Sequence, residues 1–309
     1  MTLPPRPGGG QLITRLQGRA VRVAALLALS LCVAACSALK LGYENLPRLA
    51  TWQADRYLAL DDEQESLVAR RVGELQGWHR QNLLPVYAGF LGRIEEQVLA
   101  TVTAEQVADW RRELVDGWEP LARKLAPAVA ELAVTLRPEQ LAHLRGAIAR
   151  ANEKAAQKHH PADPALRPTV RYRSLVERTE SFFGEASDVQ KAAIHETLPA
   201  SVDQAERWWR ARLARQQAVV ALLEALALEK PPAAEAERRA RAVLLELFDD
   251  VRDRAGEDAR DRAEAKRPSP NPGDVLTARL LTLATPQQRR HLVSSLRDYR
   301  DDFRLLAAR

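Results

Sequence analysis

Apolar residues recur at intervals of three and four along most of this chain, and this repeat constrains the fold more than any other feature of the sequence. The longest stripe consists of Val107, Trp110, Leu114, Trp118, Leu121, Leu125, Val129, Leu132 and Leu136. Such spacing places all its members on one face of an α-helix, whereas a strand would alternate. Glycine is scarce, with 14 residues in 309. We therefore expect an all-α protein, a multi-helix bundle of roughly eight to ten helices.

Proline-rich segments divide the expected helices. Residues 159–168 and the loop at 267–273 each carry three prolines, and Pro231 and Pro232 separate two apolar stripes. Inside the longest stripe, Pro120 and Pro127 favour a kinked helix or two abutting helices, because proline has no backbone N–H to donate. We expect a helical body over residues 48–309, with a candidate internal boundary near 159–168. One domain or two would both suit this length.

A short pattern recurs at the expected helix starts, where a Ser, Thr or Asp stands three residues ahead of a Gln. The pairs are Asp61 and Gln64, Thr103 and Gln106, Ser187 and Gln190, and Thr285 and Gln288. This is the capping box, in which each of the two side chains accepts a hydrogen bond from the other residue's backbone N–H. Arg137 and Gln140 follow the same plan, but an arginine cannot accept, so that copy is weaker. Ser201 and Gln204 form a looser sixth copy.

The N-terminal segment has the pattern of an export signal. Arg15, Arg19 and Arg22 precede an uncharged run over residues 23–35, which ends in small residues before Cys36. The run is shorter than the roughly 20 apolar residues that span a bilayer. The segment resembles the signal peptides of lipoproteins, which implies cleavage after residue 35 and acylation of Cys36. Cys32 is the other cysteine, and Leu31 before it is too large for the cleavage site.

Processing also changes the charge. Removal of residues 1–35 takes away four arginines and no acid, which leaves 42 basic against 41 acidic residues in place of a formal charge of +5. Arg171, Arg173 and Arg178 alternate with Glu177 and Glu180, a mixture typical of the solvated side of a helix. Because no basic patch stands out, we do not expect nucleic-acid binding.

Motifs of catalysis and metal binding are missing from the sequence. The histidines lack the spacing of a zinc protease, and we expect the adjacent His159 and His160 to lie in a surface loop. No nucleophile elbow or Gly-rich phosphate loop occurs. We expect the acid pairs on the solvated surface: Glu95–Glu96, Asp249–Asp250 and Asp301–Asp302. We therefore expect no enzyme, no cofactor and no metal site, with hydrolase activity as a distant alternative.

Aromatic residues concentrate between residues 52 and 91, next to arginines. The candidate binding patch consists of Trp52, Tyr57, Trp78, His79, Arg80 and Tyr87. Aromatic residues with arginine are enriched at protein interfaces, although the same residues would also suit the core of the helices nearest the lipid. Further on, the adjacent Trp208 and Trp209 cannot both point inward on one helix. We expect one of them to be partly exposed or covered by another segment.

Two family resemblances follow from these motifs. The segment from Tyr43 to Leu91, with Trp52, Leu83-Leu84-Pro85 and Tyr87, resembles a family of Gram-negative lipoproteins classed as domain of unknown function 6279. This implies an exported lipoprotein with a helical body, and the resemblance supplies no activity. The capping boxes alone resemble the Leu-Thr-x-x-Gln motif of the periplasmic chaperones Spy and CpxP, which cradle unfolded clients on a concave surface.

These observations together predict a lipid-anchored helical protein of the cell envelope that binds another protein. Ser37 stands where an inner-membrane retention signal usually has Asp, so we expect attachment to the outer membrane, facing the periplasm. Residues 36–47 would tether the body to the lipid. The alternative is an ATP-independent chaperone like Spy, whose partners would be unfolded clients.

Overall fold

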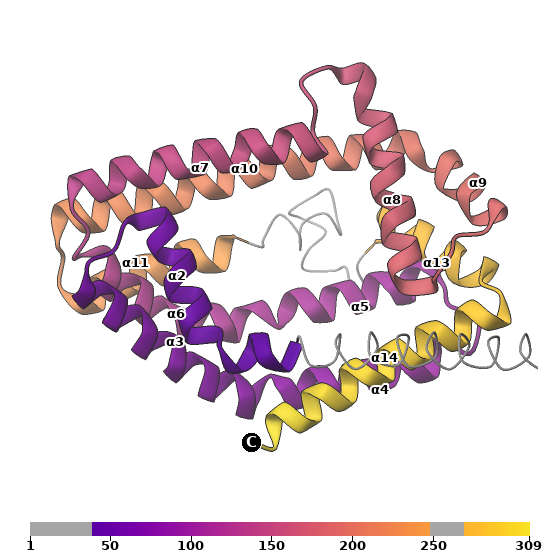
Figure 1. The fold of residues 1–309 in the computed structure, drawn as a ribbon, viewed down its shortest axis with the longest axis horizontal. Helices are drawn as coiled ribbons and strands as arrows, with labels where there is room; N and C mark the ends of the chain where they lie inside the picture. The colour runs from indigo at the N-terminus through magenta and orange to yellow at the C-terminus, as the bar shows by residue number, and fades with distance from the viewer. Residues whose placement is uncertain (1–38, 248–268) are drawn as a thin grey trace, which may run out of the picture. The chain divides into compact units, whose positions relative to one another are not determined.

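The computed structural model describes residues 39–247 and 269–309 (Figure 1). Residues 46–309 form one compact unit, and residues 39–45 belong to a separate N-terminal unit. Cys36, the signal segment before it and the acid pair Asp249–Asp250 lie outside the described residues. In the ranges that are described, no helix is both long and apolar enough to cross a membrane.

The fold is all-α, as the apolar repeat predicted, but the expected number of helices was too low. Residues 46–247 and 269–309 contain twelve α-helices and one short 3-10 helix, Pro164–Leu166. The α-helices are α2 Leu46–Leu58, α3 Asp62–Asn82, α4 Leu84–Gln97, α5 Ala104–Asp116, α6 Trp118–Ala133, α7 Pro138–His159, α8 Arg167–Phe183, α9 Asp188–Glu196, α10 Leu198–Glu229, α11 Ala233–Glu246, α13 Pro272–Leu283 and α14 Pro286–Ala307.

The additional helices arise where a single residue separates two abutting helices. Leu83 separates α3 from α4, Gly117 separates α5 from α6, and Thr197 separates α9 from α10. Each junction residue keeps right-handed helical backbone angles, and a proline follows two or three residues later. The proline ring removes a hydrogen bond and crowds the preceding turn, so one helix ends and another begins. The expected break in the longest stripe therefore falls at Gly117, and Pro127 lies inside α6.

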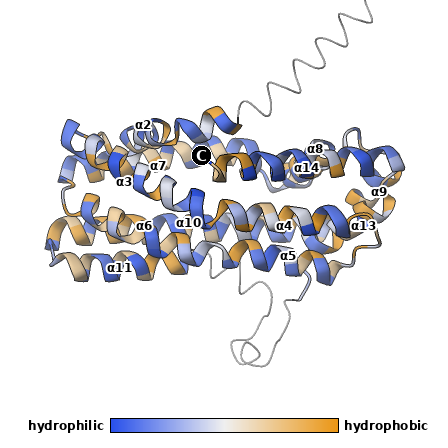
Figure 2. Cartoon of the chain, turned by 90° about the horizontal axis from the view of Figure 1, so that it is seen from below, coloured by the Kyte–Doolittle hydropathy of each residue, from blue (hydrophilic) through white to orange (hydrophobic). Residues whose placement is uncertain are grey.

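Two hydrophobic cores stabilise the unit. The first joins α2, α6, α7, α11 and the C-terminal half of α10, and it is rich in alanine: Ala122, Ala126, Ala130, Ala133, Ala236 and Ala240 are all buried. Small side chains on α6 and α11 let these two helices pack closely. The second core joins α5, α8, α9, α13 and α14 around Phe183, Ile194 and Leu281. Figure 2 shows the alternating hydrophilic and hydrophobic bands that such amphipathic helices require.

Four of the capping-box glutamines are joined in two pairs, one pair at each core. At the first core, Gln64 of α3 and Gln140 of α7 exchange side-chain hydrogen bonds: Gln140 Nε2 donates to Gln64 Oε1 at 2.7 Å, and Gln64 Nε2 donates to Gln140 Oε1 at 3.2 Å. Gln140 Nε2 also donates to the Ala59 carbonyl at 2.9 Å. The Arg137 side chain does not cap, as expected; it pairs instead with Asp61, the cap of the partner box, at 2.6 Å.

The second core repeats the arrangement with α9 and α14. Gln288 Nε2 donates to Gln190 Oε1 and to the Glu185 carbonyl, each at 2.8 Å. Four of the predicted boxes are complete, at Asp61, Thr103, Ser187 and Thr285. The prediction of a looser capping box at Ser201 and Gln204 was wrong, because Ser201 lies inside α10, which begins at Leu198.

The expectation of a surface position was wrong for one member of each of two acid pairs, whereas Glu96 and Asp301 are exposed as expected. Glu95 of α4 is buried, and it accepts hydrogen bonds from Arg297 at 2.7 and 3.0 Å and from Arg300. Asp302 is buried as well. The arginines belong to α14, which packs along α4 (Figure 1), so the contact that buries Glu95 joins helices about 200 residues apart in sequence.

Candidate functional site

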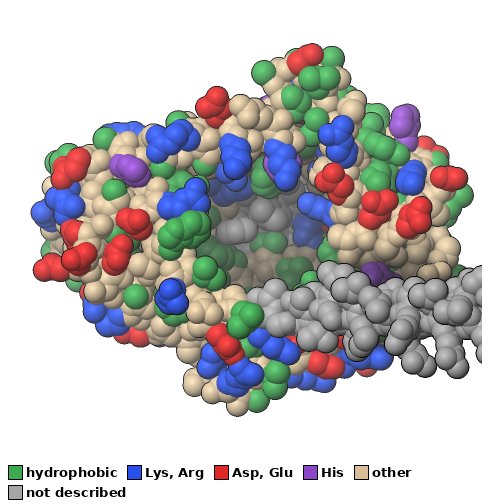
Figure 3. Space-filling model, in the orientation of Figure 1, with side chains coloured by type: hydrophobic (Ala, Val, Ile, Leu, Met, Phe, Trp, Pro, Cys, Tyr) green, Lys and Arg blue, Asp and Glu red, His purple; other side chains and the backbone are tan. Residues whose placement is uncertain are grey.

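A cavity of about 850 Å³ opens between α8, α10 and α13, with further lining from α4, α5 and α14. Its lining is mostly apolar and includes Ile94, Val98, Leu175, Phe182, Leu276, Leu280, Leu281, Leu292 and Leu296. Figure 3 shows this face of the molecule hollowed, with Lys and Arg side chains among those around the hollow. The volume falls within the range of about 300–1,000 Å³ that small-ligand sites occupy.

A capping box that the sequence analysis missed builds one wall of the cavity. Asn271 caps α13: its Oδ1 accepts from the backbone N–H groups of Gly273 and Asp274, at 2.8 and 3.1 Å. Asp274, in the N3 position, accepts from the Asn271 N–H at 2.9 Å. This box differs from the predicted pattern because Asp, not Gln, stands at N3, but the sequence Asn-Pro-Gly-Asp carries a cap, a proline at N1 and an acid at N3.

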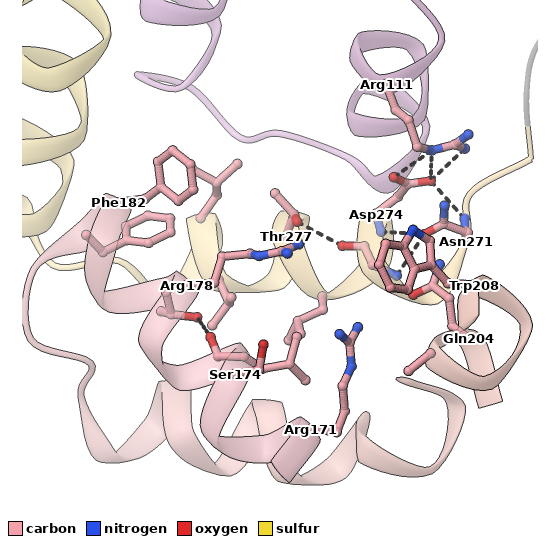
Figure 4. A pocket seen from close by; sticks show the side chains of 18 of the residues that line it. Arg111, Arg171, Ser174, Arg178, Phe182, Gln204, Trp208, Asn271, Asp274 and Thr277 are labelled. Carbon is pink, nitrogen blue, oxygen red and sulfur yellow. Dashed lines mark hydrogen bonds and ion pairs between the residues drawn. The ribbon is translucent and has the colours of Figure 1, made fainter. Parts of the chain in front are cut away.

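Arg111 of α5 completes this wall. Its Nε lies 3.1 Å from both carboxylate oxygens of Asp274, and a terminal nitrogen lies 2.9 Å from Oδ2 (Figure 4). Asp274 is buried, so its charge is acceptable only because the guanidinium and the cap satisfy its oxygens. The pair fixes the start of α13 against α5 and leaves neither charge available to a ligand.

The opposite wall, α8, carries two arginines without such partners. Arg171 and Arg178 both line the cavity, and Ser174 lies between them on the same helix face (Figure 4). No carboxylate in the described parts of the chain pairs with either guanidinium, and Arg171 Nε is buried without a hydrogen-bond partner. Burial lowers the pKa of Arg171, and the charge of Arg178 lowers it further. The expected solvated helix face is therefore confirmed for Arg173, Glu177 and Arg178, which are exposed, whereas Arg171 is partly buried against the cavity.

Aromatic side chains form the third part of the site. Phe182 is 50% exposed and Trp208 is 43% exposed, although both line the cavity. The guanidinium carbon of Arg212 lies 6.0 Å from the centre of the Trp208 ring. The adjacent Trp209 stacks on His160, with ring centres 5.0 Å apart and planes within 7°. One tryptophan is thus partly exposed and the other covered, as the sequence predicted.

His160 is not the surface histidine that the proline-rich loop suggested. Its Nε2 lies 2.8 Å from Glu206 of α10, and Arg167 at the start of α8 donates to the same carboxylate at 2.8 Å. These bonds, with the His160 contact first, lower the pKa of Glu206. The cluster ties the loop after α7 to α10 beside the cavity. Elsewhere in the described ranges, no three potential ligands gather as a metal site would require.

The residues of the predicted aromatic patch lie on three helices. Trp52 is exposed on α2 beneath Arg56, whose guanidinium carbon is 4.9 Å from the ring centre, whereas Tyr57 packs against the first core. Trp78, His79 and Arg80 occupy the end of α3 and are half-buried. The structure brings His79 and Tyr87 together, with ring centres 5.7 Å apart, and Tyr87 in turn contacts Phe303 of α14.

Burial affects the titration of both residues in this contact. It lowers the pKa of His79 and raises that of Tyr87, because each charged form would lose water. These two side chains therefore pack neutral between α3, α4 and α14. Trp52 remains the exposed member of the predicted patch.

Comparison with known proteins gives one result. A sequence model of a family of unknown function, DUF6279, matches residues 56–246. No curated protein and no solved structure matches the chain. The matched region runs from the end of α2 to the end of α11, and it contains α8 and α10 with their cavity-lining residues.

Proposed function

The chain belongs to DUF6279, a family of unknown function, and we propose that it is a lipid-anchored binding protein of the cell envelope whose ligand site is the cavity between α8, α10 and α13. The observation that carries this proposal is the cavity itself. Large apolar cavities with a few polar groups are the usual form of ligand sites. Phe182 and Trp208 keep about half of their surface open there, an arrangement that a core would avoid and a ligand would cover.

The polar groups around the cavity support binding rather than catalysis. Asp274 is held by Arg111 and by its own cap, and Glu206 is held by His160 and Arg167. A general acid or base must be able to exchange protons with a substrate. Carboxylates engaged in several charged hydrogen bonds are poorly suited to that role and well suited to fixing the walls of a site.

The location in the envelope rests on the N-terminal sequence. A lipid on Cys36 would hold the chain at a membrane, and residues 36–47 would connect it to the folded unit. About ten extended residues span roughly 35 Å, so the start of the folded unit would stay within that distance of the bilayer surface. Ser37 favours the outer membrane, with the body in the periplasm.

The experiment is a binding measurement with a neutral apolar dye, N-phenyl-1-naphthylamine, on residues 36–309 made without lipid by Cys36→Ser. We expect the dye to become fluorescent on binding. Ser174→Phe should abolish the increase, because the ring would occupy the cavity. The matched control is Ser181→Phe, at an exposed position of the same helix outside the lining. If both variants bind the dye like the parent protein, the cavity is not the site.

A chaperone like Spy is the second candidate, since exposed Phe182 and Trp208 would also contact unfolded clients. Light scattering from an aggregating client distinguishes the two. Suppression near equimolar ratio that Ser174→Phe removes would favour the chaperone, whereas dye binding without suppression would favour a small ligand.

A further inference from the structure

Arg171 is a partly buried arginine of α8 that lines the cavity. Several other partly buried arginines have carboxylate partners: Arg71 with Glu131, Arg111 with Asp274, Arg167 with Glu206, and Arg300 with Glu95. Arg171 and Arg178 have none within residues 39–247 and 269–309, and they face an apolar cavity. A charge in such surroundings is costly unless a counter-ion meets it, and two adjacent cations increase that cost.

The charge of the whole lining points to an anion. Arg111 and Asp274 neutralise each other, and the remaining charged residues of the lining are Arg171 and Arg178. Arg171 is the deeper of the two, and Arg178 is exposed at the edge of the cavity. Guanidinium groups bind carboxylates through paired hydrogen bonds in one plane, and the hydroxyl of Ser174 lies between them as a further donor.

Beyond these groups the cavity offers a ligand little to hydrogen-bond. Asn271 accepts from the start of α13, Asp274 is occupied by Arg111, and Thr277 donates to the Gly273 carbonyl at 2.8 Å. A peptide in this space would leave its backbone N–H and C=O groups unpaired, at a cost for each group. A hydrocarbon chain has no such groups, and it would cover Phe182, Leu276 and Leu280.

We propose that the cavity binds a long-chain fatty acid, with its carboxylate held by Arg171 and Arg178 and its hydrocarbon chain among the leucines of α13 and α14. This inference rests on the proposed function and names the ligand class of the same site. The ligand supplies both missing elements: a compact anion for the uncompensated arginines and a flexible apolar chain for the exposed aromatic rings. It also accounts for the lack of acids on the cavity face of α8, since a carboxylate built into the protein would compete with the ligand.

Displacement of the neutral dye from unlipidated residues 36–309 tests this proposal with three ligands of one chain length. Hexadecanoate is the anionic carboxylate, hexadecan-1-ol is the neutral analogue, and hexadecyl phosphate is a different anion. We expect hexadecanoate to bind at least about tenfold more tightly than the alcohol, the gain typical of a charged hydrogen-bond pair. Hexadecyl phosphate binding more tightly than hexadecanoate would overturn the carboxylate assignment.

The decisive variant is the double substitution Arg171→Gln with Arg178→Gln. It should reduce hexadecanoate binding to the level of the alcohol and leave alcohol and dye binding unchanged. Arg173→Gln is the matched control, because Arg173 is exposed on the same helix outside the lining. A preference for hexadecanoate that survives the double substitution would overturn the inference. Failure of the parent protein to bind the dye or any of the three ligands would instead overturn the proposed function.

Thermal melting gives an independent readout of folding. The double variant should melt at the same temperature as the ligand-free parent or higher, because it removes the partly buried charge of Arg171 and its repulsion with Arg178. Hexadecanoate should raise the melting temperature of the parent and of Arg173→Gln, and leave that of the double variant unchanged. An equal rise in all three proteins would contradict the role of the arginines.

Discussion

At the scale of single residues, Glu206 links pH to stability. Its folded-state pKa is lowered by His160 and Arg167, so its contribution is complete above the ordinary pKa of glutamate, about 4.3, and is lost as the pH falls through the folded-state value. We expect Glu206→Gln to reduce the free energy of unfolding at pH 7 by about 1.5 kcal/mol. The difference from the parent should shrink as the pH is lowered from 5 to 3.

Urea unfolding followed by circular dichroism at each pH measures this difference. Asp203→Asn is the control, an exposed acid on the same helix whose loss should change stability little at any pH. A deficit for Glu206→Gln that stays constant down to pH 3 would show that packing, not charge, explains the effect.

Lys230 is a second residue whose conformation makes a prediction. It caps the C-terminal end of α10 in the left-handed region, with φ 44°, where a side chain is strained. Lys230→Gly should raise the free energy of unfolding by about 0.5–1 kcal/mol, since glycine adopts this conformation freely. Lys154→Gly, inside α7, should lower it by about 1 kcal/mol. Urea unfolding of both variants checks the opposite signs.

At the scale of helices, the paired capping boxes lock helix starts together. Gln140→Leu would leave the Ala59 carbonyl, the Arg137 N–H and part of Gln64 unpaired in a buried place, at an expected cost of about 2–3 kcal/mol. Gln106→Leu, in the solitary box of α5, should lower the free energy of unfolding by about 1 kcal/mol or less.

Because Gln64 and Gln140 bond to each other, the double variant Gln64→Leu with Gln140→Leu should lose less stability than the sum of the two single losses. Strict additivity in urea unfolding would contradict a direct coupling.

Helix starts were predictable from the sequence because a capping box is local, with both of its residues within one turn. The partners of those boxes were not, since Gln64 and Gln140 lie 76 residues apart and Gln190 and Gln288 lie 98 apart. The predicted surface position of Glu95 was wrong for the same reason, because the arginines that bind it come from α14, which is distant in sequence. For the cavity, the sequence offered arginines alternating with glutamates on α8, a pattern typical of a solvated face. Only the packing of α8 against α10 and α13 places Arg171 beside an apolar space, with the exposed Arg178 at its edge.

At the scale of the whole molecule, the proposed lipid anchor would determine where the cavity meets its proposed ligand. We expect the full chain, expressed in a Gram-negative host, to incorporate labelled palmitate and to sediment with membranes. Cys36→Ala should abolish both, because a thiol at the cleavage site is the only acceptor of the lipid. Cys32→Ala is the matched control and should leave both unchanged. Label that follows Cys32, or sedimentation that persists in Cys36→Ala, would contradict the anchor. A folded unit tethered to a bilayer would meet acyl chains released there at high local concentration, which joins the proposed anchor to the ligand proposed for the cavity.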